Sequence, residues 1–253
     1  MISFTEAEVM AWITPLLWPF LRTLALFSAM PVLGTRSVPA RVRIALSALI
    51  VLAAQPTLPA MPVVPLDSAL AVMLVVQQVL IGVTLGFAVR VVFTAIEFAG
   101  EIVGLQMGLN FAAFFDPISA GTATTTSRFF GTTIAWLFIV INGHLLIVMA
   151  LVQSFTAFAV GPEPFAFLRA TQPQAWGGQI FQTGLTIALP LVAMLLLVNV
   201  VLGVISRVAS QLNVFSIGFP ITLSVGLLGL LLTLPALQQP FTVALEQMLA
   251  HFQ

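Results

Sequence analysis

Hydrophobic positions fill long, nearly continuous stretches of this chain. Six stretches meet the window criterion for membrane spans: 10–34, 44–64, 68–96, 129–160, 180–206 and 214–237. The strands of a membrane barrel would be apolar only at every second position, whereas these stretches are apolar on all sides. The pattern therefore predicts an all-α integral membrane protein of about six apolar helical segments.

The second stretch contains four prolines, which cannot lie inside an unbroken helix: Pro56, Pro59, Pro62 and Pro65. We expect its helix to end near Ala54 and residues 55–66 to form an extended connector. The fourth stretch is interrupted by Asn142-Gly143-His144, and Asn-Gly is a turn signal. Either two short helices are hinged there, or one kinked helix carries a satisfied polar cluster.

The composition supports a membrane setting and excludes several function classes. Of the 253 residues, 60% are hydrophobic and 6% are charged, and the mean hydropathy is +1.15. A soluble domain carries about a quarter charged residues. The net charge of zero predicts no nucleic-acid partner. The chain has no cysteine and two histidines that lie far apart, so we expect no metal site.

The two ends of the chain and the arginines predict an orientation. The N-terminus lacks the basic start and cleavage site of a signal peptide, so we expect the first apolar segment to stay attached. If Arg36, Arg41 and Arg43 lie in a cytoplasmic loop, six spans place Arg128 and Arg207 on the same side. Both chain ends then lie outside the cytoplasm.

Residues 97–128 interrupt the series of apolar stretches. Gly100, Gly104 and Gly108 recur every four residues, which predicts three bare backbone patches on one helical face. An apolar run over 109–115 follows and is ended by Asp116-Pro117. A long loop with an apolar tip is unusual unless it is functional. It is either an interfacial loop lying on lipid or a gate.

Three charges lie near the end of the third stretch. If one helix runs from about 70 to 105, Arg90, Glu97 and Glu101 fall within about 40° of one another around its axis. They form an exposed helix end, a subunit contact or the wall of a hydrated passage. Arg22 lies inside the first apolar stretch and needs a counter-charge, a carbonyl cluster or water. We expect it to pair within an assembly.

No catalytic signature is present. Without lysine the chain cannot form a phosphate-binding Gly-x-x-x-x-Gly-Lys loop, and the zinc-protease and nucleophile-elbow motifs are missing. We therefore expect no enzyme, no catalytic residues and no cofactor.

The segment from Arg207 to Pro220 is specific. It resembles the C-terminal signature of the export-gate family of type III secretion systems, the FliR/SctT family, through Asn213, Phe215, Gly218, Phe219 and Pro220. Ser210 departs from the proline usual in that family. Further matches follow in family order along almost the whole chain: Pro31–Gly34, Val38–Arg43, Met107–Phe111 with Asp116-Pro117, Asn142–His144, Ser154-Phe155, Leu189-Pro190 and Asn199.

The resemblance implies a place in an assembly. It implies one export-gate domain over 1–253, with a FliP-like part over about 1–128 that includes the central loop, and a FliQ-like part over about 129–253. Its segments would form helical hairpins in a helical hetero-oligomer with FliP and FliQ, lifted largely out of the bilayer plane. It also implies FlhB, FlhA, inner rod proteins, unfolded export substrates and membrane lipid as partners. The location would be the flagellar basal body at the bacterial inner membrane.

Both lines of reasoning meet in the central loop. A pore for unfolded chains must not leak ions, and an apolar constriction can close it by dewetting. We predict a plug formed by Met107, Gly108, Leu109, Asn110, Phe111, Phe114 and Phe115. We also predict that Arg207 anchors the neighbouring polar turn to another subunit or to the cytoplasmic face. The leading function is a structural and gating subunit of the flagellar export gate. Alternatives are the same subunit of a virulence injectisome, or a proton-coupled secondary transporter.

Overall fold

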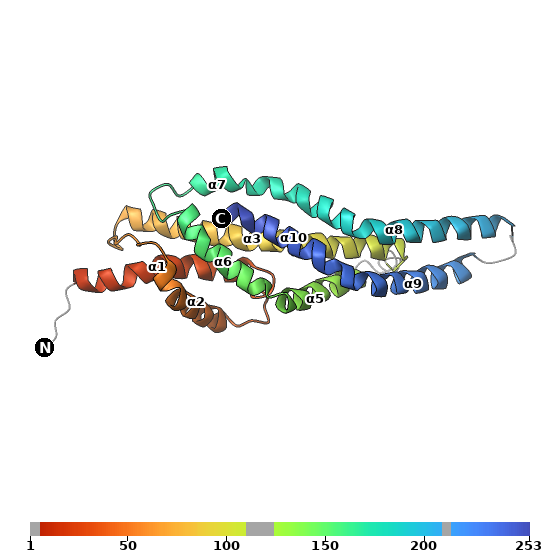
Figure 1. Ribbon diagram of the computed structural model, residues 1–253, viewed down its shortest axis with the longest axis horizontal. Helices are drawn as coiled ribbons and strands as arrows, with labels where there is room; N and C mark the ends of the chain where they lie inside the picture. Colours follow the sequence, from red (N-terminus) through yellow and green to blue (C-terminus); the bar gives the residue numbers. More distant parts are fainter. Residues whose placement is uncertain (1–5, 110–123, 209–213) are drawn as a thin grey trace. The chain divides into compact units, whose positions relative to one another are not determined.

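The computed structural model describes residues 6–109, 124–208 and 214–253, and side chains from residue 12 on, except those of 214–216. These residues form α-helices and short 3₁₀ turns, with no strand among them, as predicted (Figure 1). The helices are α1 (Glu6–Ala29), α2 (Ala40–Ala54), α3 (Ala69–Gln106), α5 (Thr125–Val140), α6 (Gly143–Ala157), α7 (Ala166–Thr171), α8 (Trp176–Val208), α9 (Val214–Thr233) and α10 (Gln238–Leu249). The 3₁₀ turns are η1 (Gln55–Thr57), η2 (Pro173–Ala175), η3 (Leu234–Leu237) and η4 (Ala250–Phe252).

Four of the described helical segments are long and apolar enough to cross a membrane, or five if α5 and α6 together form one span. The sequence predicted about six. The first apolar stretch forms α1 but is not among these candidates, whereas α2 with η1 is. Helix α2 ends at Ala54, as the prolines predicted, and η1 adds one 3₁₀ turn before the extended connector.

The fourth stretch forms two helices, α5 and α6, which is one of the two alternatives left open by the sequence. Asn142 lies between them with φ 57°, in the left-handed region. Asparagine tolerates this conformation because its short polar side chain adds little steric strain. The backbone N–H of Ile141 still bonds to the Leu137 carbonyl, so α5 closes its last turn before the break.

The chain divides into two compact units. Unit 1 comprises residues 1–91, 142–176 and 245–253. Its core cluster contains Trp18, Val64, Ala71 and Leu74. Helix α2 folds back along α1 (Figure 1). A set of packed aromatic rings joins α3, α6, α7, the start of α8 and the chain end: Phe87, Phe158, Phe167, Trp176 and Phe252.

Unit 2 comprises residues 92–141 and 177–244. Phe93 of α3 makes edge-to-face contacts with Phe138 of α5 and Phe241 of α10, both with ring centroids 5.7 Å apart. Glycines let the other helices approach closely. A Cβ on Gly184 of α8 would lie 2.5 Å from the Ala95 carbonyl oxygen of α3, and one on Gly229 of α9 would lie 2.5 Å from Met194 of α8.

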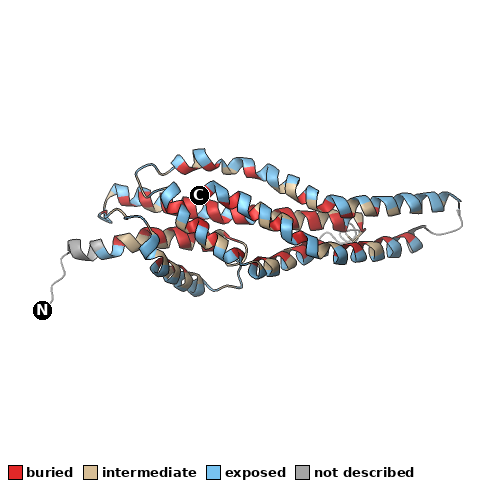
Figure 2. Ribbon diagram, in the orientation of Figure 1, coloured by how far each residue is buried: buried red, intermediate tan, exposed pale blue. Residues whose placement is uncertain are grey.

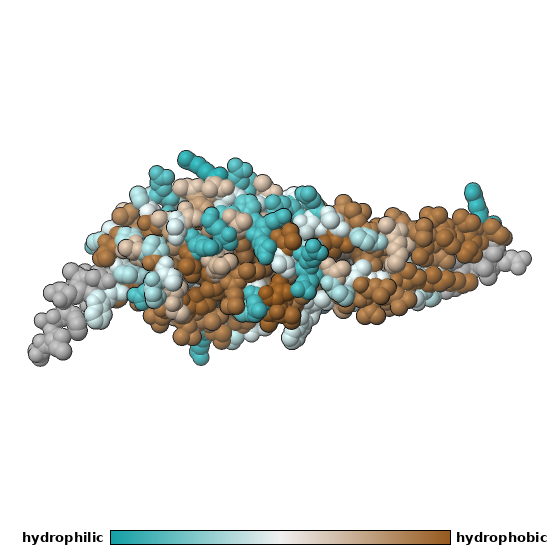
Figure 3. All heavy atoms as spheres, in the orientation of Figure 1, coloured by the Kyte–Doolittle hydropathy of each residue, from teal (hydrophilic) through white to brown (hydrophobic). Residues whose placement is uncertain are grey.

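Burial is uneven among the candidate spans. In its most apolar window, 67% of α3 is buried inside the chain, compared with 17% for the segment that contains α8 (Figure 2). Apolar side chains cover the outer faces of α8 and α9 (Figure 3), including Leu197, Val200, Val204, Leu228 and Leu232. These faces require an apolar environment, which lipid or a neighbouring subunit provides.

Candidate functional site

The end of α3 leads directly into the central loop. Gly108 has φ 79°, a conformation that glycine adopts without steric cost. The N–H of Leu109 bonds to the Gly104 carbonyl and the N–H of Gly108 to the Leu105 carbonyl, both at 3.1 Å. This pair of bonds is the Schellman motif, which terminates helices. The prediction that Gly108 forms a third bare patch on the helix is therefore wrong, because Gly108 ends the helix.

The other two glycines of that series lie on the predicted face. A Cβ on Gly100 would lie 2.9 Å from the carbonyl oxygen of Thr126 and from the ring of Phe130, both in α5. A Cβ on Gly104 would meet the Thr126 side chain. Helices α3 and α5 therefore pack with their backbones close together, as the spacing predicted.

Met107 anchors the end of α3 to α9. Its side chain is fully buried. It fills the space beside Gly226, where a Cβ would lie 2.6 Å from the Met107 Cγ atom. Leu109 is half-buried. These residues hold the base of the central loop within unit 2.

Most residues of the predicted plug lie outside the part of the chain that the structure describes. Asn110, Phe111, Phe114 and Phe115 lie outside the described residues, as do the motif residues Asp116, Pro117 and Asn213. The side chain of Phe215 lies outside them as well. The plug therefore stays a prediction, supported at its base by Gly108 and Met107.

Of the predicted signature near the C-terminus, Gly218, Phe219 and Pro220 lie in the first half of α9. Gly218 is buried, whereas Phe219 and Pro220 are exposed. The helix continues through Pro220. Thr222 donates its hydroxyl to the carbonyl oxygens of Gly218 and Phe219, both at 3.1 Å, within the turn that contains the proline.

The three charges on α3 have different surroundings. The helix is unbroken through Arg90, Glu97 and Glu101, as their predicted angular relationship requires. Arg90 is exposed, and Glu97 and Glu101 are half-buried. The Glu97 carboxylate rests on α5, where a Cβ on Gly131 would lie 2.8 Å from its Oε1 atom. Among the described residues, no group of three or more His, Asp or Glu side chains could hold a metal ion.

Arg22 is fully buried in unit 1 and bonds to the end of α6. Its Nη1 donates to the carbonyl oxygen of Ser154 at 2.7 Å and to its hydroxyl at 3.0 Å, and Nη2 donates to the Phe158 carbonyl at 2.9 Å. The guanidinium carbon lies 3.8 Å from the ring centroid of Phe155. A cation at a helix C-terminus is favoured because the last carbonyls carry partial negative charge.

Two glutamines complete this polar cluster. The Nε of Arg22 donates to Gln78 Oε1 at 2.8 Å, and Gln78 donates to Gln77 at 2.9 Å. Gln77 then bonds to the backbone of Gly161 and Glu163 after α6. Of the three partners that the sequence allowed for Arg22, the structure supplies a carbonyl cluster. A further contact to a neighbouring subunit stays a prediction.

Sequence reasoning missed Gln77 and Gln78. Their signal was available: two adjacent amides inside an otherwise apolar stretch must find partners, because an unsatisfied buried polar group is costly. The resemblance did single out Ser154 and Phe155, and both contact Arg22.

Comparisons with known proteins find related sequences over nearly the whole chain. Residues 13–248 match the family "Bacterial export proteins, family 1". The chain is 44% identical over 244 residues to the flagellar biosynthetic protein FliR of Escherichia coli K12, covering 95% of the chain and 92% of the relative. It is 42% identical to the protein of the same name from Pectobacterium carotovorum, covering 93% and 90%. For the Bacillus subtilis protein of that name the identity is 27%, with 90% and 91% covered.

Proposed function

Because the chain belongs to family 1 of the bacterial export proteins, we propose that it acts as a structural and gating subunit of the flagellar type III export gate. The similarity to flagellar biosynthetic proteins over nine-tenths or more of both chains carries this conclusion. The chain is a membrane protein of the flagellar export apparatus. We place it at the bacterial inner membrane, where exported flagellar subunits leave the cytoplasm.

The exposed apolar faces of α8 and α9 favour assembly with other subunits. A hetero-oligomer with FliP and FliQ would cover them, with FlhB, FlhA and the inner rod proteins as further partners. Unfolded flagellar subunits would pass through the assembly. Within it, a FliP-like part over about 1–128 and a FliQ-like part over about 129–253 would form one export-gate domain.

Gating is assigned to the central loop. Its base is fixed because Met107 is buried beside Gly226 and a Schellman motif ends α3. A loop held rigidly at its base can present the apolar side chains of 109–115 to a narrow passage. Glu97, Glu101 and Arg90 are proposed as subunit contacts along α3.

The function is tested by deleting the gene in its host and measuring swimming and the secretion of hook and filament subunits. Loss of both, restored by the intact gene, is the expected result. Unchanged swimming with lost secretion of virulence effectors would identify an injectisome subunit instead. Retained swimming and secretion, with a lost solute gradient, would identify the transporter.

The plug is tested with a full-length variant that carries substitutions in the central loop. Replacing Phe111, Phe114 and Phe115 with serine should raise ion conductance across membranes that contain the assembled complex, because a polar constriction stays wet. Phe165→Ser is the control, since Phe165 is exposed in a different loop. Baseline conductance of the triple variant in a fully assembled complex would refute the plug.

Arg207 offers a test of assembly. It is exposed at the end of α8. Arg207→Ala should reduce the recovery of FliP and FliQ on co-purification. Arg169→Ala, at an arginine of unit 1 that is also exposed, should not. Equal recovery for both variants would show that Arg207 does not contact a subunit.

A further inference from the structure

One face of α3 is open in unit 1. Between residues 74 and 104 the helix has five exposed residues, and all of them belong to unit 1: Val76, Val79, Val83, Phe87 and Arg90. At 3.6 residues per turn, they fall within about 80° around the helix axis. These five residues form a narrow, straight strip, here called the open stripe.

The spacing of the open stripe is that of a seam between two packed helices. Val76, Val83 and Arg90 follow one another at seven-residue intervals, and Val79 lies between the first two. They occupy the a and d positions of a heptad, between which a partner helix inserts its own side chains. Lipid tails fit any apolar surface and select no such repeat. The spacing therefore favours a helix as the occupant.

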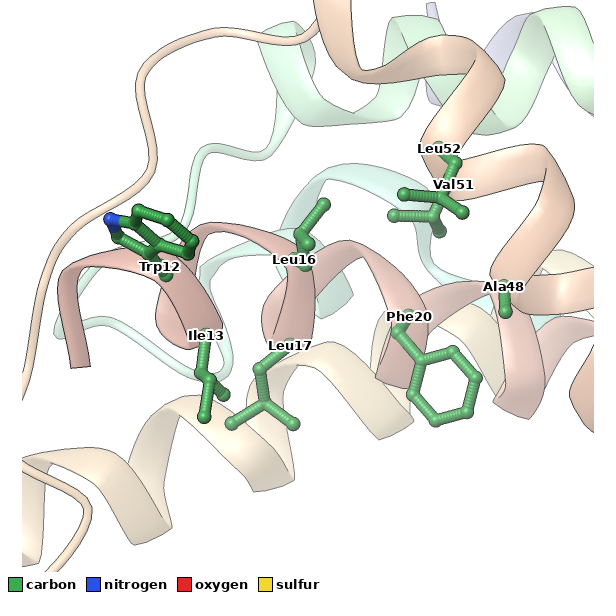
Figure 4. A pocket seen from close by; sticks show the side chains of 8 residues that line it. All are labelled: Trp12, Ile13, Leu16, Leu17, Phe20, Ala48, Val51 and Leu52. Atoms are coloured by element: carbon green, nitrogen blue, oxygen red, sulfur yellow. The ribbon is translucent and has the colours of Figure 1, made fainter. Parts of the chain in front are cut away.

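Helix α1 forms the second wall of a groove along this stripe. The groove has a volume of about 370 Å³, and Val79 and Val83 share its lining with five residues of α1: Leu21, Leu24, Ala25, Ser28 and Ala29. Three of these five side chains are small, which lets another backbone approach closely. The apolar groove between α1 and α2 (Figure 4) has no charged residue in its lining, so nothing there indicates an occupant.

Further along α3, a helix of this chain covers the same stripe. Glu97 follows Arg90 by seven residues and therefore lies in line with it. There α5 packs closely on α3 in unit 2, with Gly131 beside the Glu97 carboxylate. The chain bends by 71° between α5 and α6, and the three valines of the stripe stay exposed in unit 1. Continuity along α3 thus also favours a helix on the open part.

Arg90 determines the chemistry of the occupant. It is exposed, and among the described residues it forms no hydrogen bond or ion pair. A helix packed along the stripe would remove water from the guanidinium, and a cation without water needs an opposite charge beside it. A charged residue at one a position also fixes the register of two packed helices. Arg90 therefore selects an aspartate or glutamate on the occupant.

We propose that the open stripe and the groove beside it bind an apolar helix of another subunit, whose aspartate or glutamate pairs with Arg90. This inference rests on the proposed place of the chain in a hetero-oligomer. Apolar residues of the bound helix meet Val76, Val79 and Val83. Its acidic residue lies seven positions from the residue that meets Val83.

A photo-crosslink identifies the occupant. A diazirine side chain about the size of leucine replaces Val83 in the full chain, which is expressed with the export apparatus in its host. Irradiation and mass spectrometry should join residue 83 to an apolar segment of another subunit that has an acidic residue seven positions away. The same side chain at Ile81, which is fully buried, should give adducts within this chain only. Adducts with lipid or water alone, or with a segment lacking that acidic residue, would overturn the proposal.

Charge reversal tests the ion pair. Arg90→Glu should lower the recovery of the assembled complex at least about tenfold, because two carboxylates would then face each other. Replacing the acidic residue of the cross-linked segment with arginine should restore recovery, since the pair is then present in reverse. Arg169→Glu alters an exposed arginine outside the stripe and should leave recovery unchanged. Normal recovery with Arg90→Glu, or no restoration by the reversed pair, would refute the pairing.

The stability of the isolated chain separates assembly from folding. In detergent, Arg90→Glu should leave the unfolding temperature unchanged, because Arg90 has no partner among the described residues. A lower unfolding temperature would place the contact of Arg90 within this chain and would overturn the inference. If the intact chain itself recovered no export subunit, the proposed function would fail, whereas normal assembly of the Arg90→Glu chain would refute the pairing alone.

Discussion

Gly86 of α3 lies so close to Ala29 of α1 that a Cβ on residue 86 would be 2.6 Å from the Ala29 Cβ atom. Four residues earlier, a Cβ on Gly82 would meet the Arg22 carbonyl oxygen and would lie 2.8 Å from the Ala25 Cβ atom. The α1–α3 contact therefore depends on two bare backbone patches one helical turn apart.

Gly82→Ala and Gly86→Ala should each lower the free energy of unfolding by about 1–3 kcal/mol, because backbone and Cβ atoms cannot move aside as a flexible side chain can. Gly203→Ala is the control. Nothing lies within 4 Å of a Cβ there, so the helix should gain about 1 kcal/mol. Thermal unfolding in detergent measures all three, and a neutral Gly86→Ala would contradict the close contact.

The glycines show how much of the helix packing could be predicted from the sequence. The spacing of Gly100 and Gly104 predicted a close helix contact, and α5 makes it. Gly82 and Gly86 have the same spacing, but the surrounding stretch is uniformly hydrophobic and gave no sign that this spacing marks a helix contact. Gly108 fits the spacing by residue number alone, because the chain leaves the helix at this point.

The partners of the buried polar groups also could not be predicted from the sequence, and the reason is different. Arg22 and Ser154 are 132 residues apart, and no local pattern specifies such a pairing. Residue type told us that Arg22 needs acceptors, but only packing determines that the end of α6 supplies them. Three of the four boundaries between the two units are also invisible in the sequence, because they fall inside the continuous helices α3, α8 and α10. The fourth, between Ile141 and Asn142, coincides with the Asn-Gly turn signal.

Arg22→Met should destabilise unit 1 by at least about 2 kcal/mol, because buried acceptors of Phe158 and Gln78 lose their donor. Arg22→Lys should be intermediate, since an ammonium cannot reproduce the fork of the guanidinium. Arg169→Met removes an exposed arginine and should have little effect. Unfolding midpoints in detergent provide the comparison, and equal midpoints for Arg22→Met and Arg169→Met would refute a structural role.

The break between α5 and α6 makes a prediction about residue type. Asn142 is exposed and has φ 57°. Asn142→Gly should be nearly neutral, whereas Asn142→Val should cost about 1–2 kcal/mol because a branched side chain clashes in the left-handed region.

Gln172 serves as the matched site, with φ 44° and an exposed side chain. There Gln172→Gly should raise the unfolding temperature, since glutamine has no local bond to favour this conformation. The two positions together test the backbone geometry. If valine and glycine at position 142 gave the same unfolding temperature, the left-handed conformation would be wrong.

A side chain of α1 donates a hydrogen bond to the proline-rich connector. Trp18 is fully buried and donates its indole N–H to the Pro62 carbonyl at 3.0 Å. Prolines lack an N–H, so the connector cannot form a ladder of backbone bonds and depends on donors from elsewhere.

Trp18→Phe keeps an aromatic ring but removes the donor, and should lower the free energy of unfolding by about 1–3 kcal/mol. Proteases should then cut within 55–66 more rapidly than in the intact chain. Trp136→Phe, at a site 69% exposed, should leave the cleavage rate unchanged. An unchanged rate in Trp18→Phe would mean that the remaining contacts of Met61 and Val64 with the core cluster are enough to hold the connector.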